Sequence, residues 1–340
     1  MRSVREVAPL RFVASRLAAA EAVVKYVWEH PANAGHRPRA LLRLVRYQAR
    51  ARLLGGRTIA RLGERSRLWV DLHRTSAAKV MYANPPDLPE MLVWRHALRD
   101  GGLFVDVGAN VGTYTIWAAE LGAEVIALEP AADTFELLLD NMELNGYQVK
   151  AIQAAAGAHC GTARFTSGRD SRNRLDPDGP VETPLVTIDS LIEGRQVAGI
   201  KVDVEGFEIE VLRGCARALA ERRISLIQLE WNATSERALG TDRRPVADLL
   251  AQHGYRLCRP DAAGRLVPIS DTGFGVDVFA CPALSRDNPK TGIMTFYTDE
   301  LGHIGHGDLP SNHQISALVT VQAMLSLCQC ESLRAIPEIC

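Results

Sequence analysis

Short apolar runs alternate with longer amphipathic stretches through the middle of the chain. Five of the runs have the length and composition of strands buried on both faces: "LFVDV", "EVIALE", "VKAIQAA", "IKVDV" and "LIQLEW". Between most of them lie stretches with helical spacing, at residues 113–121, 133–144 and 205–222. This alternation predicts an α/β domain with a doubly wound, mostly parallel sheet.

Two further segments extend the predicted domain. The polar stretch "GTARFTSGRDSRNRLDPDGPVETPLVTIDSL" is too long for a simple crossover and predicts a hairpin or flap with its tip at residues 169–179. After the fifth run, "RRPVADLLAQHG" predicts a helix, and "YRLCRP", "RLVPIS" and "FGVDVFACP" predict closing antiparallel strands. We therefore assign residues 68–283 to this domain.

The residues on either side of the domain have a different composition. Residues 1–67 contain fifteen Lys and Arg against four Glu, and their Ala-, Leu- and Arg-rich pattern predicts a helical, basic extension that stops at Gly55 and Gly56. Its arginines fit two interpretations. They form either a surface for phosphate, anionic lipid or nucleic acid, which would allow a peripheral membrane contact, or a solvated helix face. Residues 284–340 lack periodicity and predict a poorly structured tail.

Hydropathy and cysteine usage indicate a cytoplasmic protein. No run of about 18 uncharged apolar residues occurs, and charges interrupt the apolar stretch near the N-terminus, so neither a membrane span nor a signal peptide fits. The seven cysteines have no metal-binding spacing, and free thiols in a reducing compartment are the expected state.

The stretch "FVDVGANVGTYT", residues 104–115, contains the most informative loop. A strand that ends in Asp106 and turns through Gly108 into a helix places backbone N–H groups and a carboxylate at the carboxyl edge of a parallel sheet, where ligands bind. Glycine lets a ligand approach the backbone. The pattern D-x-G-x-N-x-G is not the dinucleotide pattern G-x-G-x-x-G. A carboxylate there repels a pyrophosphate and attracts the ammonium and sulfonium groups of S-adenosylmethionine.

The second predicted strand supports the same ligand. It ends in Glu129, twenty-one residues after Gly108, where a carboxylate can accept hydrogen bonds from both ribose hydroxyls. A capping or turn role for Asp106 and Glu129 is the structural alternative.

Five segments, in this order, resemble the FkbM-type methyltransferase family: "FVDVGANVGTYT", "ALEP", "NMELNG", "VTIDSL" and "IKVDVEGFEIEVLRG". The resemblance covers roughly residues 68–282 and says nothing about either extension. It implies a Rossmann-like class I methyltransferase that uses S-adenosylmethionine, usually to methylate a hydroxyl of a sugar, polyketide or other secondary metabolite. It also implies which residues bind the cofactor: Asp106, Gly108, Asn110 and Gly112 at the methionine end, and Glu129 at the ribose.

Methyl transfer to a hydroxyl needs a group that removes one proton, and the fourth predicted strand supplies candidates. The two-residue period of a strand places Lys201, Asp203 and Glu205 on one face at the carboxyl edge. We predict that Asp203 or Glu205 is the base or orients the hydroxyl, with Glu208 as a helper. Glu205 and Glu208 fit equally well as stabilisers of the following helix N-terminus. The ligand spacing of a metal site is missing, so we predict no metal.

Two other classes of function fit parts of the sequence. The arginines point to a nucleic-acid methyltransferase, and the motif "NPPD" at residues 84–87 resembles the N-P-P-aromatic loop of amino-group methylases. In that loop an aromatic residue stacks on a flipped base, and here Asp87 stands in its place. The second alternative is a methyltransferase fold that serves as a non-catalytic scaffold. We favour a small-molecule or glycan acceptor over nucleic acid.

Overall fold

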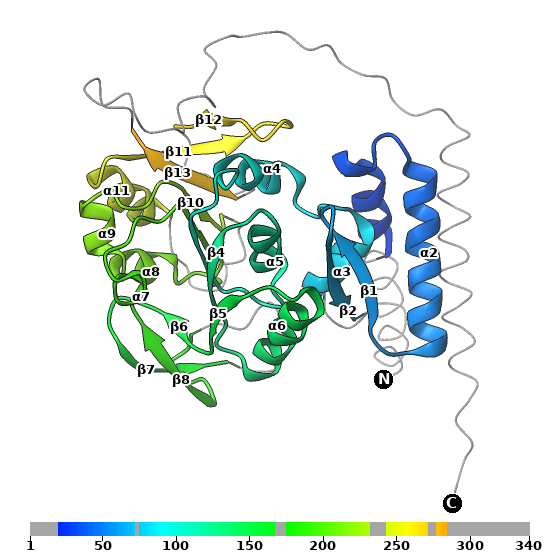
Figure 1. Ribbon diagram of the computed structural model, residues 1–340, viewed down its shortest axis with the longest axis horizontal. Helices are drawn as coiled ribbons and strands as arrows, with labels where there is room; N and C mark the ends of the chain where they lie inside the picture. The colour runs from blue at the N-terminus through cyan, green and yellow to red at the C-terminus, as the bar shows by residue number, and fades with distance from the viewer. Residues whose placement is uncertain (1–19, 72–74, 167–174, 232–242, 271–276, 284–340) are drawn as a thin grey trace, which may run out of the picture.

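The computed structural model describes residues 20–71, 75–166, 175–231, 243–270 and 277–283, which are coloured in Figure 1. Most of the predicted flap tip and the predicted tail from residue 284 onward lie outside these ranges. Within them, no helix combines the length and the apolar character needed to cross a bilayer.

An eight-stranded sheet forms the centre of the molecule, in the order β12-β11-β13-β10-β9-β3-β4-β5. The five strands from β10 to β5 are parallel, and β13 runs antiparallel to both of its neighbours. The bounds are β3 (Leu103–Val107), β4 (Glu124–Leu128), β5 (Val149–Ile152), β9 (Gly199–Val202), β10 (Ile227–Leu229), β11 (Tyr255–Pro260), β12 (Leu266–Pro268) and β13 (Val278–Pro282). The predicted parallel strands and the antiparallel closing strands are confirmed.

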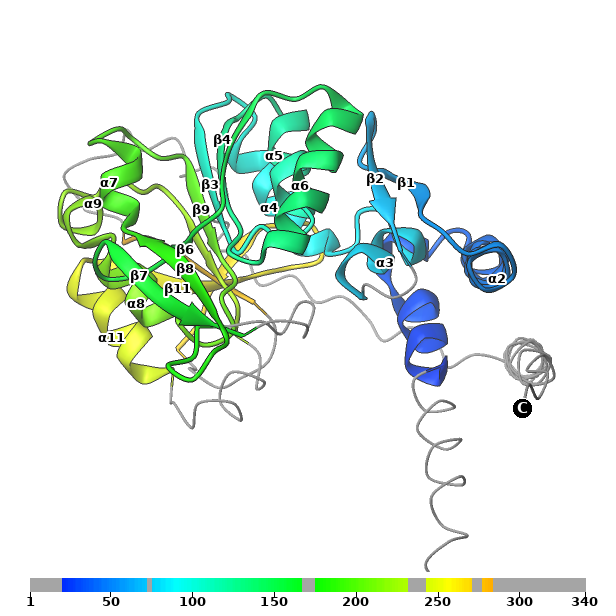
Figure 2. The same ribbon diagram turned by 90° about the horizontal axis from the view of Figure 1, so that it is seen from below.

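Helices cover both faces of this sheet, as Figure 2 shows. One face carries α4 (Leu88–Ala97), α5 (Thr113–Glu120) and α6 (Ala132–Asn145), and the other carries α7 (Ile188–Ile192), α8 (Glu208–Arg213), α9 (Ala216–Ala220) and α11 (Arg244–Gln252). Consecutive residues of β3 belong to two different hydrophobic clusters, Phe104 to the first and Val105 to the second. Because side chains alternate along a strand, each cluster lies on one face. The predicted doubly wound α/β, Rossmann-like fold is confirmed.

The stretch predicted as one helix over residues 205–222 is two short helices instead, α8 and α9. Between them, Gly214 packs so closely on the segment after β6 that a Cβ would overlap the carbonyl oxygen of Gly157. The carbonyl of Gly214 also accepts a hydrogen bond from the N–H of Asp189 at 3.0 Å. The prediction was wrong because these two long-range contacts take the chain off the helix axis.

The predicted flap contains a hairpin. Strands β7 (Gly161–Phe165) and β8 (Val181–Val186) pair antiparallel, and β6 (Ala155–Ala156) adds a third strand beside β8. The hairpin prediction is confirmed for the described residues.

The N-terminal layer comprises a helix over residues 20–29, η1 (Pro31–Asn33), α2 (Arg37–Leu54), β1 (Thr58–Leu62), β2 (Ser66–Val70) and α3 (Thr75–Tyr82). The helix ending before Gly55 is confirmed. Residues 58–62 are not helical: β1 pairs antiparallel with β2, so the boundary predicted at residue 67 falls inside a hairpin. Alternate residues of both strands are buried, a period of two that a count of arginines and leucines does not detect.

The N-terminal layer is attached to the sheet domain by polar and apolar contacts. The carboxylate of Glu120 in α5 accepts hydrogen bonds from the backbone N–H groups of Glu64, Arg65 and Ser66 at 2.9, 3.1 and 2.7 Å. Buried leucines of α2 belong to the same hydrophobic cluster as Trp94 and Trp117. The extension and the domain therefore share one core.

Candidate active site

The predicted site residues meet at the carboxyl edge, by which we mean the carboxyl ends of β3, β4, β9 and β10. The strand order reverses at β3, with β4 and β5 on one side and β9 and β10 on the other. The loops that leave β3 and β9 diverge there to opposite faces, which leaves a crevice suited to a ligand.

The loop of residues 108–112 is held by backbone contacts to both neighbouring strands. The N–H groups of Gly108 and Ala109 donate to the carbonyl of Leu128 at 3.0 and 2.8 Å. Gly108 has φ 78°, and a Cβ there would overlap the carbonyl oxygen of Asp203. Sequence reasoning explained this glycine by the approach of a ligand. The structure adds the chain's own backbone at the end of β9 as a reason for glycine.

Glu129 lies beside this loop at the end of β4, as predicted. The residue is 6% exposed, Oε2 accepts from the N–H of Asn110 at 2.9 Å, and Oε1 accepts from the N–H of Ala131 at 2.9 Å. Burial outweighs these hydrogen bonds and raises its pKa to about 7. A cationic or hydroxyl-bearing ligand bound here would therefore stabilise the ionised form of the Glu129 carboxylate.

Asp106 lies beneath the loop rather than in it. Its side chain is buried, and Oδ2 accepts a hydrogen bond from the hydroxyl of Thr115 at 2.6 Å. Burial raises the pKa of this carboxyl, against the lowering effect of Lys201. The contacts join β3 to α5, and a direct role for Asp106 at the cofactor stays a prediction.

Lys201 and Asp203 form an ion pair at the end of β9. Lys201 Nζ lies 2.8 Å from Asp203 Oδ2 and 4.7 Å from the ring centre of Tyr114. The lysine side chain is 6% exposed, whereas that of Asp203 is 38% exposed and reachable by an acceptor. Burial acts to raise the pKa of Asp203, but the ammonium group of Lys201 outweighs it and lowers the pKa. Asp203 is therefore ionised at neutral pH.

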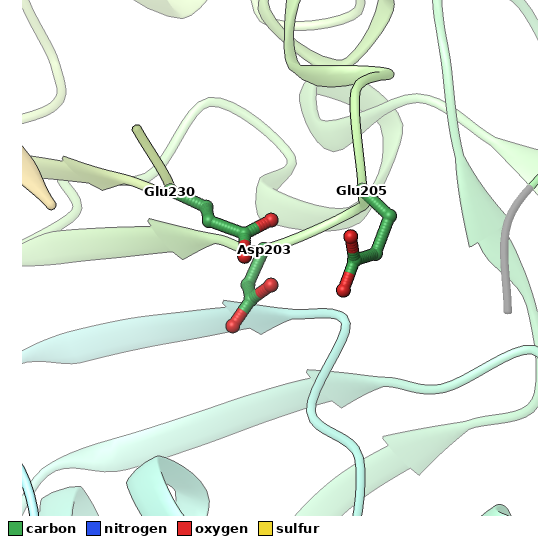
Figure 3. A group of neighbouring side chains, drawn as sticks. All are labelled: Asp203, Glu205 and Glu230. Carbon is green, nitrogen blue, oxygen red and sulfur yellow. The ribbon is translucent and has the colours of Figure 1, made fainter. Parts of the chain in front are cut away.

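Glu205 and Glu230 complete an acidic cluster with Asp203, shown in Figure 3. One carboxylate oxygen from each of the three lies within 4.8 Å of the others. Burial first, and then the charge of Asp203, raise the pKa of Glu230 to about 10, so this carboxyl is protonated at neutral pH. Three carboxyl groups at this spacing also have the donor chemistry of a divalent-cation site. The predicted absence of a metal stays a prediction.

Glu208, the predicted helper, is held in a buried ion pair. Its Oε2 lies 2.5 Å from Nη1 of Arg243, and its Oε1 accepts from the N–H of Gly206 at 3.0 Å. The guanidinium of Arg243 lies over the ring of Trp231 at 5.3 Å. These contacts join α8 to the start of α11, so the described role of Glu208 is to position the loop after β9. Its part in catalysis stays a prediction.

A buried polar network under the carboxyl edge was not predicted. Gln228 of β10 donates from Nε2 to Asp277 at 2.8 Å and to the hydroxyl of Tyr114 at 3.3 Å, and its Oε1 accepts from the indole of Trp94. The pKa of Asp277 rises to about 6 because the carboxyl is buried. The available signal was a glutamine inside the apolar run "LIQLEW", because a polar residue in a doubly covered strand needs partners.

Trp231 and the motif "NPPD" have structural roles in the described residues. Trp231 is fully buried, so its ring packs in the core. In "NPPD", the amide of Asn84 pairs with the backbone N–H and carbonyl of Gly63 at 2.7 and 3.1 Å, and the carbonyl of Pro86 accepts from Tyr26 at 2.7 Å. The motif thus ties the N-terminal layer to α4.

The sequence of the chain is similar to those of known methyltransferases. Residues 106–257 match the sequence model of the Methyltransferase FkbM domain. The chain is 29% identical over 153 residues to the hexuronic acid methyltransferase AglP of Haloferax volcanii, covering 43% of this chain and 60% of the relative. It is 29% identical over 146 residues to Methyltransferase 1 of Beauveria bassiana, covering 34% and 59%. The chain thus spans about three fifths of the length of both relatives.

Two solved structures are also similar. Magnesium protoporphyrin IX methyltransferase ChlM from Synechocystis PCC 6803, with bound S-adenosylmethionine, has 14% identity and a TM-score of 0.33 over 58% of this chain and 78% of that one. The tRNA (uracil-54, C5)-methyltransferase of Pyrococcus abyssi, in complex with S-adenosyl-L-homocysteine, has 16% identity and a TM-score of 0.37 over 66% and 43%.

Proposed function

We propose that this chain, whose residues 106–257 form a methyltransferase FkbM domain, transfers a methyl group from S-adenosylmethionine to a hydroxyl group of a sugar or another small molecule. The observation that carries the proposal is the loop of residues 108–112 beside the buried carboxylate of Glu129, at the point where the strand order reverses. Ligands of open α/β sheets bind at such points.

The residues of the carboxyl edge fit this donor. The loop of residues 108–112 contains no cationic side chain, and the surrounding carboxyl groups favour a ligand with ammonium and sulfonium charges. Each oxygen of Glu129 accepts one backbone N–H and retains a lone pair for a ribose hydroxyl. A cationic ligand would also lower the pKa of Glu129, which burial raises.

Asp203 is the group that we assign to the acceptor. When bound, S-adenosylmethionine supplies an electrophilic methyl group, and its sulfur leaves as a neutral thioether with the electrons of the broken C–S bond. Lys201 fixes Asp203 through Oδ2, and the Asp203 carboxylate accepts a hydrogen bond from the acceptor hydroxyl and takes its proton as the new C–O bond forms. Protonated Glu230 donates a hydrogen bond to Asp203 and keeps it ionised.

The acceptor class rests on the similarity to the hexuronic acid methyltransferase AglP. Its name makes a hexuronic acid the first acceptor to test. Glu205 and Glu230 lie beside Asp203 and have the chemistry to hydrogen-bond further hydroxyls of a sugar ring.

Calorimetric titration with S-adenosylmethionine tests the cofactor assignment. The wild type should bind saturably, the variant Glu129→Ala should bind at least about tenfold more weakly because a charged hydrogen-bond partner is lost, and Glu143→Ala on the exposed face of α6 should bind like the wild type. Absence of binding by a folded wild type would sink the proposal.

Product analysis with glycosides of hexuronic acids and of neutral sugars tests the acceptor. Methyl ether formation on a hydroxyl supports the proposal. Transfer to the uronate carboxylate, to nitrogen or to RNA, with none to a hydroxyl, would contradict it.

A further inference from the structure

The outer face of α2 combines exposed arginines with exposed leucines. The exposed side chains recur at three- and four-residue steps, so they share one side of the helix: Arg39, Leu42, Arg46, Arg50, Leu53 and Leu54. We call these six residues the α2 face. Leu53 and Leu54 are 78% and 76% exposed, and Leu42 is 48% exposed. The opposite side of α2 is buried in the core, so this face is not needed to hold the helix in place.

A cavity of about 540 Å³ adjoins the α2 face. Its lining contains four arginines of α2 together with Thr58 of β1 and Met81 of α3. One of the arginines, Arg43, is fixed by hydrogen bonds from Nε to the carbonyl of Met81 at 2.8 Å and from Nη2 to the carbonyl of Tyr82 at 2.9 Å. The cavity is therefore a preformed cationic recess with apolar side chains in its walls.

The charges of the α2 face are not balanced within the described part of the chain. Helix α2 contains six arginines and no acidic residue. Among the described residues, no ion pair includes Arg39, Arg46 or Arg50. Figure 1 shows α2 on the outer side of the β1–β2 hairpin, away from the central sheet. Within the described residues, the face thus presents a row of positive charges without acidic partners.

We propose that the α2 face docks on a membrane surface that contains anionic phospholipids. The arginines bind lipid phosphates, one of them in the recess beside Arg43, and Leu42, Leu53 and Leu54 enter the boundary between headgroups and acyl chains. The leucines favour a membrane over a single-stranded nucleic acid. Proteins that bind single strands stack the bases on aromatic side chains, and the α2 face contains no aromatic side chain. The proposal is independent of the methyl transfer proposed above.

Co-sedimentation of the full chain with vesicles tests this docking. The protein should bind vesicles of phosphatidylcholine mixed with phosphatidylglycerol, bind pure phosphatidylcholine weakly, and dissociate as NaCl is raised. The double variant Arg46→Gln, Arg50→Gln should lose about 30-fold in partitioning, and Leu53→Ser, Leu54→Ser should lose about tenfold or more. Circular dichroism verifies that each variant is folded.

A matched control separates this face from general charge. The double variant Arg99→Gln, Arg265→Gln removes the same charge from side chains that are 59% and 55% exposed elsewhere, and it should sediment like the wild type. Equal binding to neutral and anionic vesicles, or full binding by either α2 double variant, would overturn the proposal. Binding of inorganic phosphate or of an RNA oligonucleotide that needs Arg46 and Arg50, without vesicle binding, would overturn it in favour of a soluble anion.

Discussion

At the carboxyl edge of the sheet, Lys201 and Arg243 are each buried against a carboxylate, whereas on the α2 face Arg46 and Arg50 are exposed among other arginines. The net charge of −1 conceals this contrast. Buried pairs depend on geometry and resist salt, while exposed like charges act at a distance and are screened. The location and the partners of a charge therefore indicate its role better than its sign.

The largest effect is expected at Asp203. Replacing it with Asn should lower kcat by roughly 10²- to 10⁴-fold, because the proton of the acceptor hydroxyl loses its receiving group. Binding of S-adenosylmethionine should persist. The control is Glu210→Gln in α8, a carboxylate 34% exposed that pairs with Arg213. Unchanged turnover in the Asp203 variant would remove this residue from the mechanism.

The variants Arg243→Gln and Arg46→Gln compare the contributions of the two regions to stability directly. The Arg243 change leaves the 1% exposed carboxylate of Glu208 without its partner and should cost about 3 to 5 kcal/mol of the free energy of unfolding. The Arg46 change should cost no more than about 0.5 kcal/mol. Urea denaturation measures both, and equal losses would show that the buried pair does not stabilise the loop after β9.

Lys201→Met should move the acid limb of the pH profile of kcat/KM. The ammonium group keeps the pKa of Asp203 below its usual value, so the ionised form is lost only when the pH falls through that lowered pKa. Without the ammonium group, burial raises the pKa of Asp203, and the acid limb should shift to higher pH. Lys201→Arg should restore most of the original profile. A lysine with only a packing role would change the rate without moving the limb.

Glu230→Gln should have the smallest effect on turnover at neutral pH, because the carboxyl is already protonated there. Its pKa of about 10 is above the unfolded value, so the folded state binds an extra proton, and wild-type stability should fall as the pH rises from about 5 toward 10. The variant should lose less stability over that range in thermal melts at pH 7 and pH 9. If wild type and variant lose the same stability, Glu230 is ionised in the folded protein.

Prediction from sequence succeeded where local patterns determine structure. Runs of apolar residues located β3 and β4, and the residues that follow them located the loop of residues 108–112 and Glu129. It failed where distant contacts decide. Gly214 breaks a helix because of the carbonyl of Gly157, and β1 is a strand because β2 lies beside it.

The candidate site divides along the same line. Lys201 and Asp203 were placed together because they are two residues apart on one strand. Gln228 and Asp277 are brought together by the pairing of β10 with the neighbouring strand β13, which no local spacing reveals. The ion pair of Glu208 with Arg243, thirty-five residues away, was not predicted for the same reason.

The missing side chain of Gly108 lets the loop after β3 rest on the backbone of Asp203. In mechanical terms, the loop that we propose for the methyl donor rests directly on the backbone of the residue that we propose as the proton acceptor. A displacement of one is transmitted to the other, and misplacement by about 1 Å can cost roughly 100-fold in rate. The substitution Gly108→Ala would therefore misalign donor and acceptor without changing any charged residue.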